Sequence, residues 1–155
     1  MKGNDKILAT LNSLLADELT AISQYMVHSE MCDNWRYTEL HKKIEERAIT
    51  EMKHAERLIA RILFLDGTPI VSNLNKINIG ATIEAQLSND LAAEYGAVKG
   101  YNEGIHLAYE LGDNGSRELM DSILVDEEEH VDWIEAQIEQ VKVMGIQAYL
   151  VEQVD

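Results

Sequence analysis

Apolar residues recur at alternating steps of three and four along four long stretches of the chain, which is the spacing of an amphipathic α-helix. The rows run through Leu8, Leu11, Leu15 and Ile22, then Ile44, Leu58, Ile62 and Leu65, then Leu87, Leu91, Val98 and Ile105, and finally Met120, Ile123, Ile134 and Val141. Each row predicts one helix of roughly 25 to 30 residues, or about 40 Å in length.

The breaks between these stretches predict how the helices connect. The first break (32–34) and the third (112–115) are short, so the helices on either side are antiparallel neighbours, and Asn114 or Ser116 can cap the fourth helix. The second break starts at 66–69 with the only proline, Pro69, and continues to residue 81. Gly145 ends the fourth helix, and residues 146–154 predict a short fifth helix.

This order of helices predicts an all-α fold, a ferritin-like four-helix bundle with one long crossover between helices two and three. The chain of 155 residues is long enough to bury a core, and we expect one domain over residues 1–155. The first ten residues are too polar for a signal peptide, and no run approaches the roughly 20 apolar residues of a membrane span.

Charge and cysteine content narrow the classes of partner. The chain has 28 acidic and 13 basic residues, a net charge of −15, which disfavours nucleic acids and anionic membranes and favours cations. Cys32 is the only cysteine, so no internal disulfide can form and a reducing compartment is expected. We therefore expect a cytoplasmic protein.

Six positions in the apolar rows hold acids or histidines instead: Glu18, Glu51, His54, Glu94, Glu127 and His130. Each histidine follows a glutamate by three residues, so on a helix the two side chains share one face. The three polar residues of the first half recur 76 residues later, and Tyr25 lands on Tyr101 at the same offset. The repeat predicts two helical hairpins that each supply half of one site.

The chemistry of that site follows from its predicted position in the core. Four ionised carboxylates buried together destabilise a fold unless something neutralises them. Two divalent cations would balance four carboxylates, and a mixed oxygen and imidazole donor set suits iron or manganese, with zinc as a further option. Mg²⁺ or Ca²⁺ would not need the imidazoles. Two glutamates with two Glu-x-x-His pairs are the known ligands of di-iron carboxylate bundles.

The sequence also resembles the bacterioferritins over essentially its whole length. The resemblance rests on the opening Met1-Lys2-Gly3, on 16–19 with Glu18, on Tyr25, on Asp33-Asn34-Trp35, on 51–56, on 61–67 and on 127–130. It implies an iron-storage subunit with ferroxidase activity that oxidises Fe(II) with O2 or H2O2. It also implies a hollow cage of about two dozen subunits, with mineral inside and a small ferredoxin that assists iron release.

Carried over by position, the resemblance gives each residue a role. Glu18 and His54 would be terminal ligands of one iron, Glu94 and His130 of the other, and Glu51 and Glu127 would bridge the pair. Met52 would ligate haem b, with a second methionine from a two-fold related subunit. Thioether ligation of haem iron is chemically reasonable, and the stripe Ile49, Met52, Ile59 and Leu63, interrupted by Glu56, is typical of a subunit interface.

Other functions remain open on the sequence alone. The same bundle could be a peroxidase or manganese catalase, or a haem-bearing or structural subunit that co-assembles with an active partner. The single cysteine argues against a rubrerythrin, and two Glu-x-x-His pairs in one chain argue against a DNA-protection miniferritin. Tyr25 could donate an electron, form a hydrogen bond near the metals, or be a core tyrosine. His28, His41 and His106 are expected to be structural or exposed.

Overall fold

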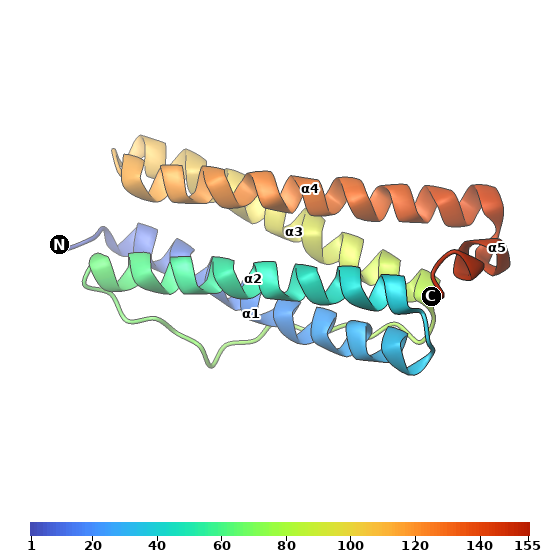
Figure 1. Cartoon of the computed structure of the whole chain (residues 1–155). Coiled ribbons are helices and arrows are strands. Elements are labelled where there is room, and N and C mark those ends of the chain that lie inside the picture. The colour runs from blue at the N-terminus through green and yellow to red at the C-terminus, as the bar shows by residue number, and fades with distance from the viewer.

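The computed structural model describes residues 1–155 as five helices without a strand. They are α1 (Asp5–Asn34), α2 (Thr38–Phe64), α3 (Ile83–Glu110), α4 (Asn114–Met144) and α5 (Ile146–Val151). The four long helices form a bundle, and α5 lies at one end of it (Figure 1). The predicted all-α bundle is confirmed, including the long crossover and the short fifth helix.

The bundle consists of two antiparallel hairpins, α1–α2 and α3–α4, and α1 also packs on α3. Each hairpin turn contains one residue with left-handed backbone, Arg36 in the first (φ 67°) and Gly112 in the second (φ 71°). These residues are 76 positions apart, so the repeat extends to the turns. The left-handed conformation suits glycine but costs about 1 kcal/mol for a residue with a Cβ such as Arg36.

The cap of α4 differs from the sequence-based expectation. The N-cap residue is Asp113, whose Oδ1 accepts a hydrogen bond from the backbone N–H of Ser116 at 3.0 Å. Neither Asn114 nor Ser116 is the cap, because the helix already begins at Asn114. The Ser116 hydroxyl instead donates to Asp113 Oδ2 at 2.6 Å and reinforces the same turn.

The crossover from α2 to α3 runs along α1 without regular structure (Figure 1). Polar side chains on one face of α1 hold its backbone: Asn12 accepts from Ile70 N–H at 2.8 Å, Thr20 from Asn75 N–H at 2.8 Å, Gln24 from Asn78 N–H at 3.0 Å and His28 from Gly80 N–H at 3.0 Å. These bonds replace those that a helix or strand would supply to the crossover backbone.

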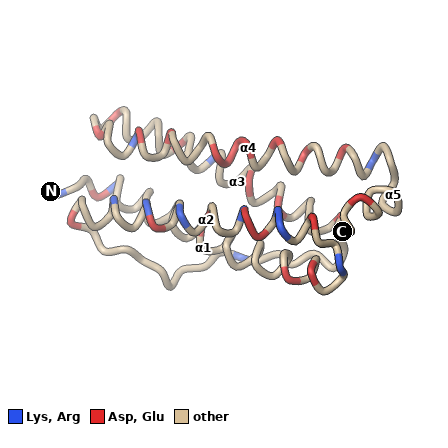
Figure 2. The backbone as a smooth tube through the Cα atoms, in the orientation of Figure 1, with Lys and Arg blue, Asp and Glu red and all other residues tan.

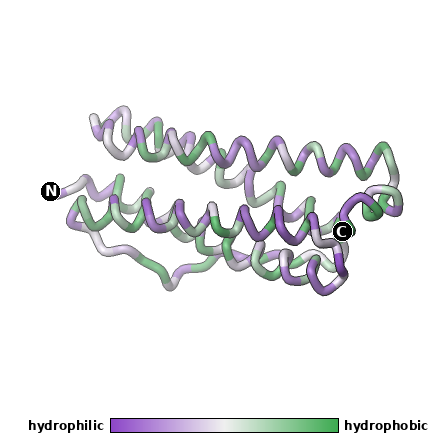
Figure 3. Tube along the Cα trace, viewed as in Figure 1, coloured by the Kyte–Doolittle hydropathy of each residue, from purple (hydrophilic) through white to green (hydrophobic).

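The core is divided into two apolar layers. Hydrophobic and hydrophilic positions alternate along every long helix (Figure 3), as the sequence predicts. One layer includes Leu11, Leu15 and Leu58, and the other includes Ile44 and Leu87. Between them along the helices lie the acids and histidines of the predicted site.

Elsewhere acidic residues are spread along the helices with fewer basic ones among them (Figure 2). No helix combines the length and apolarity needed to cross a membrane.

Candidate dinuclear metal centre

Each long helix supplies one glutamate to a single buried cluster. Glu18 comes from α1, Glu51 from α2, Glu94 from α3 and Glu127 from α4, and each side chain is at most 2% exposed. They meet because every one takes a core position in the apolar row of its helix. Burial of four carboxylates at one level is unfavourable without compensating charge.

Two histidines complete the cluster, and both turn Nδ1 toward the carboxylates. His54 Nδ1 lies 2.9 Å from Glu127 Oε1, 3.5 Å from Glu18 Oε1 and 3.6 Å from Glu51 Oε2. His130 Nδ1 lies 2.9 Å from Glu51 Oε1 and 3.4 Å from Glu94 Oε1. The structure thus brings together all six residues that the sequence nominated.

The six residues form two overlapping groups, each with ligand atoms within 4.8 Å of one another. The first is Glu18, Glu51, His54 and Glu127, and the second is Glu51, Glu94, Glu127 and His130. Glu51 and Glu127 belong to both groups. Each group offers three carboxylates and one imidazole, a donor set suited to a divalent transition metal.

Unpaired polar atoms test whether metal ions fit this cluster. Each of the six residues has one buried nitrogen or oxygen that makes no well-aligned hydrogen bond: Glu18 Oε2, Glu51 Oε1, His54 Nδ1, Glu94 Oε2, Glu127 Oε1 and His130 Nδ1. The histidine atoms lie 2.9 Å from Glu127 Oε1 and Glu51 Oε1, but only as ion-pair contacts. Buried polar atoms without partners are rare and costly in folded proteins. Metal ions shared within the two groups would satisfy such atoms, so the residues present fit a dinuclear centre.

Protonation compensates the charge of the metal-free cluster. Burial raises the pKa of Glu18 and of Glu127 well above the usual range, and the nearby charge of Glu51 raises both further. Burial acts the same way on Glu51 and Glu94, but polar contacts outweigh it and both pKa values are lowered. For Glu51 these contacts are with Glu18 and His130, and for Glu94 with His130. Bound cations would replace protons as the balancing charge.

Four further side chains fix the orientation of the cluster. Tyr25 OH donates to Glu94 Oε1 at 2.5 Å, and Tyr101 OH donates to Glu18 Oε1. Arg47 Nη2 donates to the same Glu94 oxygen at 2.8 Å, while His54 Nε2 lies 2.8 Å from Asp126 Oδ2. Such partners hold ligands in a productive direction.

Sequence reasoning assigned no role to Arg47 or Asp126. Arg47 did carry a signal, since it interrupts the apolar row of α2 with a charged side chain. It is 2% exposed, and its guanidinium carbon lies 4.5 Å from the centre of the Tyr25 ring. Asp126 carried no signal, because an acid beside the Glu127-Glu128-Glu129 run resembles any solvated helix position.

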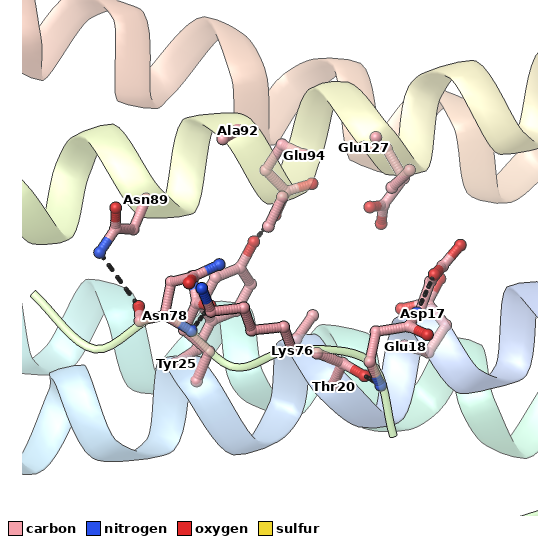
Figure 4. Close-up of a pocket in the computed structure, with 16 residues that line it drawn as sticks. Asp17, Glu18, Thr20, Tyr25, Lys76, Asn78, Asn89, Ala92, Glu94 and Glu127 are labelled. Carbon is pink, nitrogen blue, oxygen red and sulfur yellow. Dashed lines mark hydrogen bonds between the residues drawn. The ribbon is translucent and has the colours of Figure 1, made fainter. Parts of the chain in front are cut away.

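A pocket of about 290 Å³ connects the crossover to the cluster (Figure 4). Asn75, Lys76 and Asn78 of the crossover line its outer part, and Glu18, Glu94 and Glu127 line its inner part. Asp17 also lines it and adds a carboxylate outside the cluster. The pocket therefore extends from the crossover to the carboxylates between α1 and α3.

Met52 lies outside this cluster, on the opposite surface of α2. It is 44% exposed and lines a mainly apolar groove of about 350 Å³ with Ile22, Met26 and Ile49, and Glu30 and Glu45 also line this groove. The thioether sulfur makes no hydrogen bond, and the apolar part of the groove suits a flat apolar ring system. Two methionines, Met26 and Met52, line this groove, so the groove alone does not select Met52 as a haem ligand.

The fold and the carboxylate–histidine cluster define a ferritin-like protein. The sequence model of the ferritin-like domain family matches residues 8–144. The chain is 42% identical over 149 residues to bacterioferritin of Rhodobacter capsulatus, a match that covers 96% of this chain and 92% of that protein. Bacterioferritin BfrA of Mycobacterium tuberculosis (strain H37Rv) is 41% identical, and the match covers 96% of this chain and 94% of that protein. The solved structure of Mycobacterium tuberculosis bacterioferritin BfrA superimposes with a TM-score of 0.98 at 40% identity, over 100% of this chain and 98% of that chain. The chain belongs to the bacterioferritin family.

Proposed function

We propose that this chain is an iron-storage and iron-detoxification subunit that oxidises Fe(II) to Fe(III) with O2 or H2O2. The observation that carries the proposal is the pair of overlapping groups that share Glu51 and Glu127. Every member of both groups has a buried polar atom without a hydrogen-bond partner. The names of the relatives, all bacterioferritins, support the same assignment.

Each residue has a role in the proposed centre. Glu18 and His54 are terminal ligands of one substrate iron, and Glu94 and His130 are terminal ligands of the other. Glu51 and Glu127 bridge the two. Carboxylates that bridge two metals hold them close enough for one small molecule to contact both. Burial would lower the pKa of His54 and of His130, but nearby glutamates outweigh it and raise both. Each ring binds through Nδ1 as a neutral imidazole, so Fe(II) displaces the proton on that nitrogen.

The proposed reaction balances with two Fe(II) per turnover. Each Fe(II) loses one electron, and together with two protons the pair reduces O2 to H2O2, or reduces H2O2 to two molecules of water. Substrate enters through the pocket beneath the crossover, where Asp17 attracts the cation before Glu18 takes it. Tyr25 and Tyr101 hold the terminal glutamates in place from opposite sides.

We further propose that subunits associate into a cage of about two dozen copies in which the Fe(III) product is stored as mineral. The exposed apolar stripe of Ile49, Met52 and Leu63 on α2 is suited to a contact between subunits. Met52 would hold a haem there together with the same residue of a second copy. A haem at this contact would supply one-electron transfer, and a ferredoxin would be a suitable electron donor for iron release.

Stopped-flow absorbance after mixing metal-free protein with two Fe(II) per chain in air tests the proposal. A fast oxidation phase that saturates at two irons per chain is expected. Glu127→Ala or His130→Ala should remove that phase and leave the helical fold intact, since both residues are ligands. Glu128→Ala is a matched control on the same helix, because Glu128 is exposed and should leave the rate unchanged.

Saturation at one iron per chain, or an unchanged rate in both ligand variants, would contradict the assignment. If iron oxidation is absent but the metal-loaded protein consumes peroxide, the alternative of a manganese or iron peroxidase or catalase replaces storage. The mass of the particle in solution gives an independent check. A particle near two dozen subunits supports storage, whereas a dimer supports the enzyme alternative.

A further inference from the structure

A second group of metal-binding side chains lies outside the bundle, on the surface of the α1–α2 hairpin. Glu30 from α1 and His41 and Glu45 from α2 each offer one ligand atom, and these atoms lie within 4.8 Å of one another. None of the three belongs to the dinuclear cluster, although Glu30 and Glu45 line the groove beside Met52. Glu45 precedes Glu51 by six residues, so it lies about 9 Å away along α2 and roughly 240° around the helix.

The spacing of the α2 pair favours chelation. His41 and Glu45 are four residues apart and share one face of the helix. His41 Nε2 lies 3.8 Å from Glu45 Oε2. Residues at this spacing can bind one metal together, as two helical histidines do in zinc proteases. Glu30 approaches the same point from α1, so the third ligand comes from a separate helix.

The hydrogen bonds of His41 fix which ring nitrogen faces the carboxylates. Its Nδ1 lies 3.0 Å from the backbone carbonyl oxygen of Ser29, and a carbonyl only accepts, so Nδ1 carries the proton. The Ser29 hydroxyl donates to the His41 carbonyl at 3.3 Å and can also accept from Nδ1 at 3.0 Å. In the neutral ring Nε2 then has the free lone pair, and no hydrogen bond uses it. Metal-binding histidines are typically oriented in this way by a carbonyl on the other nitrogen.

We propose that Glu30, His41 and Glu45 form a separate mononuclear site for a divalent transition metal. Ligand atoms around a metal at about 2.1 Å are about 3.4 Å apart in tetrahedral geometry. The present spacing is slightly wider, and the exposed glutamate side chains can close it by changing rotamer. The imidazole favours a transition metal over Mg²⁺ or Ca²⁺. Three protein ligands leave a position for water, so the bound metal exchanges readily.

The chain contains a comparison pair that lacks two of these features. His106 and Glu110 on α3 are also four residues apart, with Nε2 and Oε1 at 3.2 Å. The His106 side chain is 74% exposed, against 19% for His41. No carbonyl holds the His106 ring and no third ligand joins it. The pair is a surface ion pair and is the control for the proposed site.

Zinc binding to the assembled, metal-free protein tests the proposal, because Zn²⁺ binds without oxidation. In isothermal titration, His41→Ala should bind one Zn²⁺ per chain fewer than the wild type, and His106→Ala should bind the same number as the wild type. Glu30→Gln should weaken that ion on the order of tenfold or more, since it removes one of three ligands. Crystals soaked in Zn²⁺ should show anomalous scattering about 2.0–2.1 Å from His41 Nε2.

Equal zinc stoichiometry in His41→Ala and wild type, or no anomalous peak at His41, would overturn the site. The circular dichroism spectrum of each variant checks that the helices remain. The result is separable from the proposed ferroxidase activity. His41→Ala should retain the fast oxidation of two Fe(II) per chain, and a wild type without that oxidation would leave the zinc test of this site unaffected.

Discussion

The two halves of the dinuclear cluster have the same donor atoms but different surroundings. Glu18 and Glu94 are equivalent by the 76-residue offset, and each accepts a hydrogen bond from the tyrosine of the opposite half. Arg47 donates a hydrogen bond to Glu94, and Glu18 has no equivalent arginine, because Ile123 occupies the position 76 residues after Arg47. The repeat therefore accounts for the six residues of the cluster, while the residues around them make the halves unequal.

A second difference concerns the histidines. His54 has Asp126 against its outer nitrogen, and the position 76 residues before Asp126 is Thr50, whose hydroxyl bonds to its own helix at Glu46 O. His130 thus lacks an equivalent carboxylate. An imidazole that donates to a carboxylate is a more basic and better oriented ligand. We expect the half with Glu18 and His54 to bind metal more tightly than the half with Glu94 and His130.

The largest effect should come from a residue that both halves share. Glu51→Ala removes a ligand from both groups and should cost two Co²⁺ ions per chain, whereas Glu18→Ala removes a ligand from one group and should cost one. Co²⁺ titration by visible absorbance measures both stoichiometries. Glu56→Ala is the control, since Glu56 is exposed on the same helix. Equal losses in the two ligand variants would mean that Glu51 does not bridge.

Removal of Arg47 should have the second-largest effect, because only the half with Glu94 has a buried arginine. Arg47→Met leaves the Glu94 carboxylate buried without its cation, and breaking a buried pair in this way costs about 3–5 kcal/mol. The metal-free variant should unfold at lower temperature, and Zn²⁺ should raise its melting temperature by more than that of the wild type. Calorimetry measures both. Arg57→Met, at an exposed arginine of the same helix, should behave as the wild type.

Asp126 tests the opposite half. Asp126→Ala removes the partner of His54 Nε2 and should weaken the tighter Co²⁺ ion about 10- to 100-fold, with little effect on the other. Competition with a chelator measures the two affinities separately. Asp132→Ala replaces an exposed acid on the same helix and should change neither. A uniform loss at both ions would show that Asp126 acts through general charge rather than through His54.

These asymmetries also show what the sequence could predict. The apolar rows determine which face of each helix is buried, so the four helices and the six polar core positions follow from periodicity alone. The partners of those residues depend on how far one helix is shifted and rotated against another. Arg47 on α2 contacts Glu94 on α3, and Glu30 on α1 lies close to His41 on α2. The periodicity of one helix cannot predict contacts between residues on two different helices. The existence of the crossover was predicted, but its path was not, because side chains of α1 hold its backbone.

The starts of α2 and α4 provide the most subtle test of the comparison. Tyr37 and Asp113 are equivalent by the same offset, but only Asp113 caps its helix with its side chain. Arg61 Nη2 also donates to Asp113 Oδ1 at 2.8 Å and links the end of α2 to the start of α4. Burial would raise the pKa of Asp113, but hydrogen bonds from Ser116 and the charge of Arg61 outweigh it, and the pKa is lowered from its ordinary 3.8.

A lowered pKa in the folded protein means that this carboxylate stabilises the fold above pH 3.8 and loses that effect as the pH falls through its folded value. Asp113→Asn keeps a capping side chain but removes the charge, so it should cost about 0.5–1 kcal/mol at pH 7. Urea unfolding at pH 7 and pH 3 measures the difference, which should shrink at the lower pH because pH 3 lies below the ordinary pKa of 3.8 and part of the stabilisation by the carboxylate is then lost. Asp121→Asn, an exposed acid of the same helix, should show no such change. A cost for Asp113→Asn that is the same at both pH values would assign the effect to cap geometry and not to the ion pair between the hairpins.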